Sequence, residues 1–127
     1  MFLSFRAAKR LLLLQVVLLF IGTQIPGAWR TGLEAGLHAP FGLSSWAHFV
    51  LFTSMAWVAH SAPMNWSVKR VISTALLFAL LTECFQFFAI DRHPRWLDVG
   101  IDMGGALLGL ALAIARTKLL PARVFPE

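Results

Sequence analysis

Charged residues are scarce in this sequence. They make up 13% of its 127 residues, whereas a soluble domain usually carries about 25%. Hydrophobic residues account for 58% of the chain, so much of its surface faces something other than water. The net charge of +5 would suit a nucleic-acid partner. The basic residues, however, lie in short clusters between apolar runs and form no continuous stripe, so we expect no nucleic-acid partner. The composition is typical of a membrane protein, and the length allows one domain, residues 1–127.

Cysteine is nearly absent, since Cys84 is the only one and lies within an apolar run. A single cysteine excludes an intrachain disulfide and provides no metal or redox motif. We therefore expect no cofactor.

The N-terminus resembles a secretory signal without its cleavage site. Arg6, Lys9 and Arg10 precede the apolar run 11–21, as in the charged and apolar parts of a signal peptide. The residues that follow, up to Pro26, contain no clear small-x-small site, and three more apolar runs come after them. We interpret the first run as a retained signal-anchor helix.

Four apolar runs are long enough to cross a bilayer, which takes roughly 17–25 mostly apolar helical residues. They cover about 8–26, 45–62, 67–90 and 97–116. Pro26 and Pro63 end the first two runs, because proline cannot continue helical hydrogen bonding. The sequence thus predicts an all-α, polytopic membrane protein with four transmembrane helices and no internal repeat.

Lysine and arginine are distributed unequally between the two sides that these helices would connect. With the N-terminus inside, the inner side holds Arg6, Lys9, Arg10, Lys69, Arg70, Arg116, Lys118 and Arg123, and the outer side holds Arg30, Arg92 and Arg95. Because positive charge concentrates in cytoplasmic loops, both termini are predicted to be cytoplasmic. We expect a multi-pass protein of the inner (plasma) membrane, with the lipid bilayer as its first partner.

The first outer connection differs from the others in length and composition. It runs from Gly27 to Leu43 and contains four glycines. We expect a flexible segment along the membrane surface, followed by Ser44 and Ser45 as caps of the second helix.

Ionisable side chains inside a membrane helix cost roughly 2.5–3.5 kcal/mol each on insertion scales, so each one requires an explanation. Here they gather near the outer ends of the last three helices. Residues three or four apart share a helical face, which pairs Glu83 with Gln86 and Asp98 with Asp102. The candidate ligand-binding set is His48, Glu83, Gln86, Arg92, Arg95, Asp98 and Asp102.

Two glycines continue the aspartate face of the last helix. Gly105 and Gly109 form a small-x-x-x-small pattern, which allows a neighbouring helix to approach closely. We expect these glycines to pack against another helix and the aspartates to point into the bundle.

Three interpretations of the polar set stay open. The carboxylates pair with Arg92 and Arg95 as a structural strut, or the two arginines hold the phosphate of a lipid-linked head group while Glu83, Gln86 and Asp98 contact its sugar or peptide. In the third, carboxylates and His48 hold a divalent metal. No compact spacing such as H-E-x-x-H supports that metal, so no metal site and no catalytic residue are assigned.

The same residues resemble a known family of membrane proteins. His48-Phe49, Glu83-x-x-Gln86, Arg92 six residues before Asp98, and Gly105-x-x-x-Gly109 are similar to the pattern of the VanZ-like proteins, strongest over 44–115. The chain departs from that pattern at Ser44-Ser45, where the family often has Asp-Lys, and at Asp102, where it usually has asparagine.

The resemblance implies a cell-envelope role, since the namesake is associated with low-level resistance to the glycopeptide teicoplanin. We expect an outer pocket that recognises a lipid-linked or glycopeptide-related ligand. The alternatives are a small membrane enzyme acting on lipid-linked envelope precursors, and a scaffold that binds a membrane-protein partner or itself through the face of Gly105 and Gly109.

Overall fold

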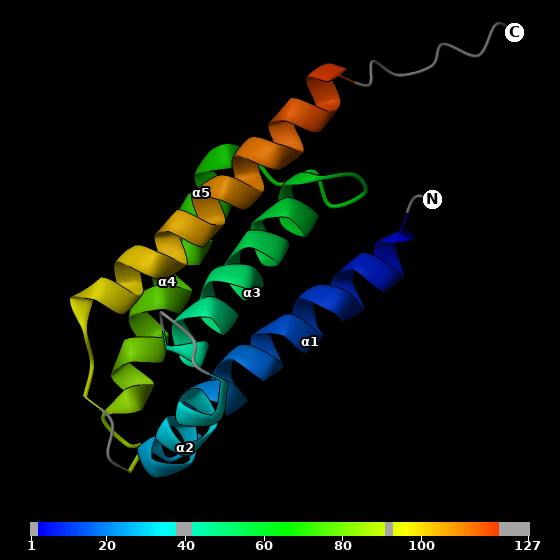
Figure 1. Ribbon diagram of the computed structural model, residues 1–127. Helices are drawn as coiled ribbons and strands as arrows, with labels where there is room; N and C mark the ends of the chain where they lie inside the picture. Colours follow the sequence, from blue (N-terminus) through cyan, green and yellow to red (C-terminus); the bar gives the residue numbers. More distant parts are fainter. Residues whose placement is uncertain (1–2, 38–41, 91–92, 120–127) are drawn as a thin grey trace, which may run out of the picture.

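The computed structural model describes residues 3–37, 42–90 and 93–119, and all of the regular structure in these ranges is helical. The helices are α1 (Phe5–Thr23), α2 (Gly27–Leu37), α3 (Leu43–His60), α4 (Val68–Gln86) and α5 (Trp96–Leu119), arranged as shown in Figure 1. The prediction of an all-α fold is confirmed.

The four long helices correspond to the four apolar runs, with shifted ends. α4 ends at Gln86, whereas the run continued to about residue 90. The chain tightens there, because Phe87, Phe88 and Ala89 donate their backbone N–H groups to carbonyls three residues back. α3 begins at Leu43, so Ser44 and Ser45 lie inside its first turn and the prediction that they cap it was wrong.

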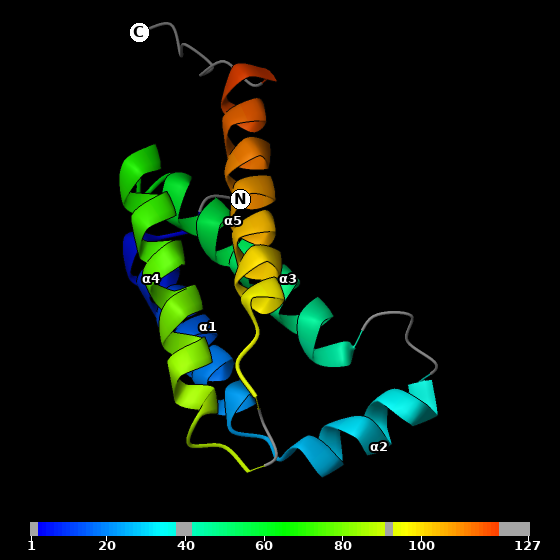
Figure 2. The same cartoon turned by 90° about the vertical axis from the view of Figure 1, so that its left-hand side faces the viewer.

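The prediction of a flexible first outer connection was also wrong, since Gly27–Leu37 forms the helix α2. Its glycines each cost a helix about 1 kcal/mol relative to alanine, but the segment also contains strong helix formers such as Ala28 and Ala35. The helix starts directly after Pro26, whose carbonyl accepts the Trp29 N–H at 3.1 Å. Figure 2 shows α2 leaving the bundle sideways, across the end where α4 stops and α5 begins.

The bundle is held together by small side chains. Seven of the twelve buried hydrophobic residues are alanines, while leucine and phenylalanine are abundant among the exposed large ones, including Leu13 at 65% and Phe88 at 82%. α3 and α5 form the most extensive helix pair, and α1 lies against α3 and α4. Small residues inside and large apolar residues outside are what helix packing within lipid requires.

By length and composition alone, one helix of the described residues qualifies as a membrane span: α5, with a mean hydropathy of 1.7. The other long helices carry ionisable side chains near their ends, namely Arg6, Lys9 and Arg10 in α1, His48 and His60 in α3, and Lys69, Arg70 and Glu83 in α4. The structure therefore supports one of the four predicted spans by this criterion.

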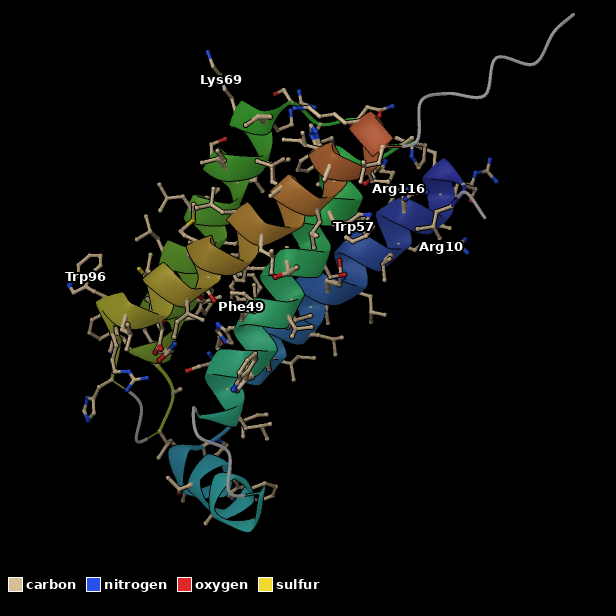
Figure 3. All side chains as sticks on the ribbon, turned by 45° about the horizontal axis from the view of Figure 1, so that its top comes forward. Arg10, Phe49, Trp57, Lys69, Trp96 and Arg116 are labelled. Carbon is tan, nitrogen blue, oxygen red and sulfur yellow. The ribbon has the colours of Figure 1, made fainter. Side chains whose placement is uncertain are left out.

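Basic residues gather at one end of the bundle. Figure 3 shows Lys69, Arg116 and Arg10 on three different helices, all at the end of the bundle away from α2. We call this the basic end and define it by Arg6, Lys9, Arg10, Lys69, Arg70, Arg116 and Lys118. The candidate site lies toward the opposite end.

Candidate functional site

The centre of the site is a buried pair between α3 and α5. His48 Nδ1 lies 3.1 Å from Asp102 Oδ1, and the two residues are 7% and 0% exposed. A histidine N–H donates well to a carboxylate, and the bond fixes the orientation of the ring. Nε2 is then the ring nitrogen left for a ligand or a proton.

The second carboxylate oxygen of Asp102 is buried, and no described group hydrogen-bonds to it. Leaving a buried polar atom unpaired costs about 1–3 kcal/mol. In proteins such an atom usually has a structural, catalytic or ligand-related explanation. Asp102 Oδ2 is therefore an acceptor of this cluster that the described residues leave without a hydrogen bond.

Glu83 joins the end of α4 to the start of α5. Its Oε1 accepts a hydrogen bond from Gln86 Nε2 at 2.9 Å, and its Oε2 accepts the backbone N–H of Arg95 at 2.6 Å. Arg95 immediately precedes α5, where backbone N–H groups have no partner within the helix. Glu83 and Gln86 are both buried, so they form a latch that positions the first turn of α5.

Arg95 also forms the polar rim of the site. Its Nε and terminal nitrogen lie 3.2 and 3.0 Å from the two carboxylate oxygens of Asp98. The Arg95 side chain is 53% exposed, and exposed pairs of this kind contribute only about 0–1 kcal/mol. The pair therefore orients the guanidinium without locking it. Arg92, the other arginine of the candidate set, lies outside the described residues.

A small cavity lies beside His48, Gln86 and Asp98, whereas Asp102, Glu83 and Arg95 are not among its lining residues. It has a volume of about 10 Å³ and is lined by Ser44, Ser45, His48, Gln86, Asp98 and Ile101. That volume is at the lower limit for a single water molecule, so the site is closed in this structure. The two serines were interpreted as caps, yet Ser44 lies four residues before His48 and so shares its helical face.

Gly105 and Gly109 bring α5 against the backbone of α3. A Cβ added at Gly105 would lie 2.5 Å from the Phe49 carbonyl oxygen, and one at Gly109 would overlap the Thr53 carbonyl oxygen. This close approach places Asp102, one turn earlier, beside His48. Because α3 occupies the glycine face, a partner chain would have to use another surface.

The described residues include no group of three or more histidine, cysteine, aspartate or glutamate side chains arranged to hold a metal ion. The structure thus gives the metal interpretation of the polar set no geometric support. The candidate site instead combines buried hydrogen-bond acceptors with the exposed guanidinium of Arg95.

Comparison with known proteins adds one match. A family model described as VanZ/LLP1 matches residues 3–119, which includes the first helix as well as the segment 44–115 where the sequence pattern is strongest. No curated protein and no solved structure matches the chain.

Proposed function

The chain belongs to the VanZ/LLP1 family, and we propose that it is a four-span inner-membrane protein whose outer polar site recognises a cell-envelope ligand. The ligand is a lipid-linked or glycopeptide-related molecule that presents a phosphate together with sugar or peptide groups. The proposal has two parts, the membrane topology and the binding of the ligand by polar side chains, and different observations support each part.

The topology is supported by where the charges lie on the helices. α1, α3 and α4 carry their ionisable residues near their ends, where long side chains reach the interface, and their middles contain no ionisable residue. The basic end collects the start of α1, the start of α4 and the end of α5. We place this end in the cytoplasm, with both termini, and α2 along the outer surface.

The observation that carries the recognition proposal is the Asp102 carboxylate. It is fully buried between membrane helices, it is bonded to His48 through one oxygen, and no described group bonds to the other. A charged side chain in such a position costs roughly 2.5–3.5 kcal/mol on insertion scales. A strut alone would not need the second oxygen, whereas a ligand hydroxyl or amide N–H would satisfy it.

Arg95 supplies the positive charge for the ligand phosphate, because a guanidinium matches phosphate oxygens in a two-pronged geometry. It already lies at the rim, 53% exposed. Gln86 and Asp98 in the small cavity would contact sugar or peptide groups. Since the cavity is too small for these groups, binding requires the Arg95–Asp98 pair to move outward, and Arg92 is proposed to join it on the phosphate.

Native mass spectrometry of the purified full-length protein tests this proposal. Wild type and the control Arg116→Ala, which removes an exposed arginine from the other end of α5, should carry the same co-purified lipid-linked molecule. Arg92→Ala and Arg95→Ala should lose it. Equal occupancy in wild type and Arg95→Ala would mean that no arginine-centred recognition occurs at this site.

A second candidate function is hydrolysis or transfer on a lipid-linked envelope precursor. It is favoured by one observation, that Ser44 and Ser45 line the same small cavity as His48, whose ring is oriented by Asp102. A serine, a histidine and an orienting carboxylate are the parts of an acyl-transfer site. A fluorophosphonate probe should then label the wild-type protein. It should label neither the double variant that combines Ser44→Ala with Ser45→Ala nor the single variant His48→Ala. A wild-type protein that stays unlabelled would exclude this chemistry.

A further inference from the structure

A larger cavity lies at the other end of the molecule. It has a volume of about 280 Å³ and is bounded by α1, α3, α4 and the connection between α3 and α4. The helices α1, α3 and α4 that enclose it lie side by side in Figures 1 and 2. None of the seven candidate residues of the outer site lines it, so the two sites share no side chain.

The cavity exists because alanines face it. Ala56 and Ala59 of α3 and Ala75 of α4 line it, and all three are buried. On the other side α1 contributes larger side chains, among them Leu12. Larger residues at the alanine positions would fill this space. Its volume is close to the lower end of the roughly 300–1,000 Å³ that small-molecule sites occupy.

The cavity walls are mostly apolar, and a charged side chain lines them at one position. Among the described residues that line the cavity, Lys9 is the one charged side chain. Lys9 is exposed, on the first turns of α1, and its ammonium lies 5.4 Å from the centre of the Phe5 ring. Trp66 also lines the cavity, with the Arg70 guanidinium 5.7 Å from the centre of a Trp66 ring. The apolar lining of the cavity thus includes one cation, Lys9, and one indole, Trp66, which has a second cation beside it.

No acidic residue of the described helices lies at the basic end. Glu34 belongs to α2, and Glu83, Asp98 and Asp102 belong to the end of α4 and the first turns of α5. The described ion pairs are His48–Asp102 and Arg95–Asp98, both in the outer site. The positive charge around the cavity must therefore be balanced from outside the described chain.

We propose that this cavity binds one acyl chain of an anionic phospholipid from the adjoining leaflet, with Lys9 contacting the phosphate. The apolar walls suit a hydrocarbon chain, and basic residues beside a membrane attract anionic head groups. Trp66 lies at the level of the head group, where indole rings are favoured. Its backbone carbonyl accepts a hydrogen bond from His60 Nδ1 at 2.8 Å. The proposal rests on the cavity and the basic end and is independent of the outer site.

Lipid titration followed by native mass spectrometry tests it. The delipidated full-length protein is titrated with palmitoyl-oleoyl phosphatidylglycerol and, in parallel, with phosphatidylcholine of the same chains. One phosphatidylglycerol should bind at lower concentration than phosphatidylcholine. Lys9→Gln should weaken phosphatidylglycerol binding by about fivefold, which corresponds to ~1 kcal/mol for one basic residue near an anionic surface, and should leave phosphatidylcholine binding unchanged.

Two matched controls separate the cavity from the basic end as a whole. Lys69→Gln removes an exposed charge of the same end that does not line the cavity, so it should change phosphatidylglycerol binding less than twofold. Ala75→Phe should fill the cavity and abolish binding of the single lipid, whereas Leu76→Phe, on the exposed face of α4, should retain it.

Three lipid-binding results would overturn the proposal: equal binding of the two lipids by wild type, equal losses in Lys9→Gln and Lys69→Gln, or unchanged binding in a folded Ala75→Phe. A protein dimer that Ala75→Phe dissociates would assign the cavity to a second copy and would equally overturn it. If Ala75→Phe does not fold, the comparison of Lys9→Gln with Lys69→Gln still decides.

Discussion

Adding one methyl group at Gly105 or Gly109 should separate α5 from α3. At Gly105 the new Cβ would lie 2.5 Å from the Phe49 carbonyl oxygen, well inside van der Waals contact, and at Gly109 the overlap with the Thr53 carbonyl oxygen is greater. Both neighbours are backbone atoms, which no rotamer change can move. The Phe49 carbonyl also accepts a hydrogen bond from the Thr53 hydroxyl at 2.7 Å, so its displacement strains a second contact.

The expected cost follows from overpacking, which typically destabilises by about 1–3 kcal/mol. Gly109→Ala should lie at the upper end of that range and Gly105→Ala below it. Gly100→Ala is the matched control, since it lies in the same helix with nothing within 4 Å of its added Cβ. That variant should be stabilised by up to ~1 kcal/mol, because alanine favours a helix over glycine.

Thermal unfolding of the purified protein in one detergent measures the three variants against wild type. For a domain of this size, 1 kcal/mol shifts Tm by about 3–5 °C. We therefore expect Gly109→Ala to melt at least 5 °C below Gly100→Ala. Equal Tm values for these two variants would show that α3 and α5 do not approach as closely as the structure has them, and the placement of His48 beside Asp102 would lose its basis.

Three further predictions concern the polar contacts. His48→Ala and Asp102→Ala should be strongly non-additive in a double-mutant cycle of denaturant unfolding, with a coupling of about 1–3 kcal/mol, because each leaves the other buried and unpaired; additive losses would contradict the pair. Glu83→Ala should speed hydrogen exchange at the Arg95 backbone amide, because the Glu83 carboxylate accepts a hydrogen bond from that N–H group. Gln86→Ala should leave the amide protected, and an unchanged exchange rate in Glu83→Ala would contradict the latch. Ser54→Ala should cost about 0.6 kcal/mol in unfolding, a typical value for one interhelical hydrogen bond in a membrane bundle, because Gln15 Nε2 donates to the Ser54 hydroxyl between α1 and α3; no loss relative to Ser73→Ala would contradict that contact.

The long helices could be predicted because length and apolar composition are local properties of the sequence. α2 could not, since the four glycines of the segment 27–43 indicated a flexible connection, and composition alone does not reveal how a segment is anchored. In the structure it is anchored at its start: the Pro26 carbonyl accepts the Trp29 N–H, and the Gly27 N–H reaches the Ile90 carbonyl at 3.4 Å. Such an anchor joins segments far apart in the chain.

The candidate site could be predicted as a group of residues but not as a set of bonds. The spacing placed His48, Glu83, Asp98 and Asp102 at similar depth. Which partner each side chain takes depends on helix rotation and on the path of the α4–α5 connection. The strut interpretation paired the carboxylates with arginines, which holds for Asp98, whereas Glu83 accepts the backbone N–H of Arg95 and Asp102 pairs with His48. The apolar cavity had no sequence signal, because it depends on how far α1 lies from three alanines.

The proposed function requires the polar site to face the outside of the inner membrane, and cysteine labelling measures this orientation. In a Cys84→Ala background, which removes the one native thiol, His93→Cys places a thiol at an exposed position just before α5, and Lys118→Cys places one at the basic end. A membrane-impermeant maleimide applied to intact spheroplasts should label His93→Cys at once and Lys118→Cys only after permeabilisation. Labelling of Lys118→Cys from outside, with His93→Cys protected until lysis, would contradict the orientation and with it the proposed role of the site.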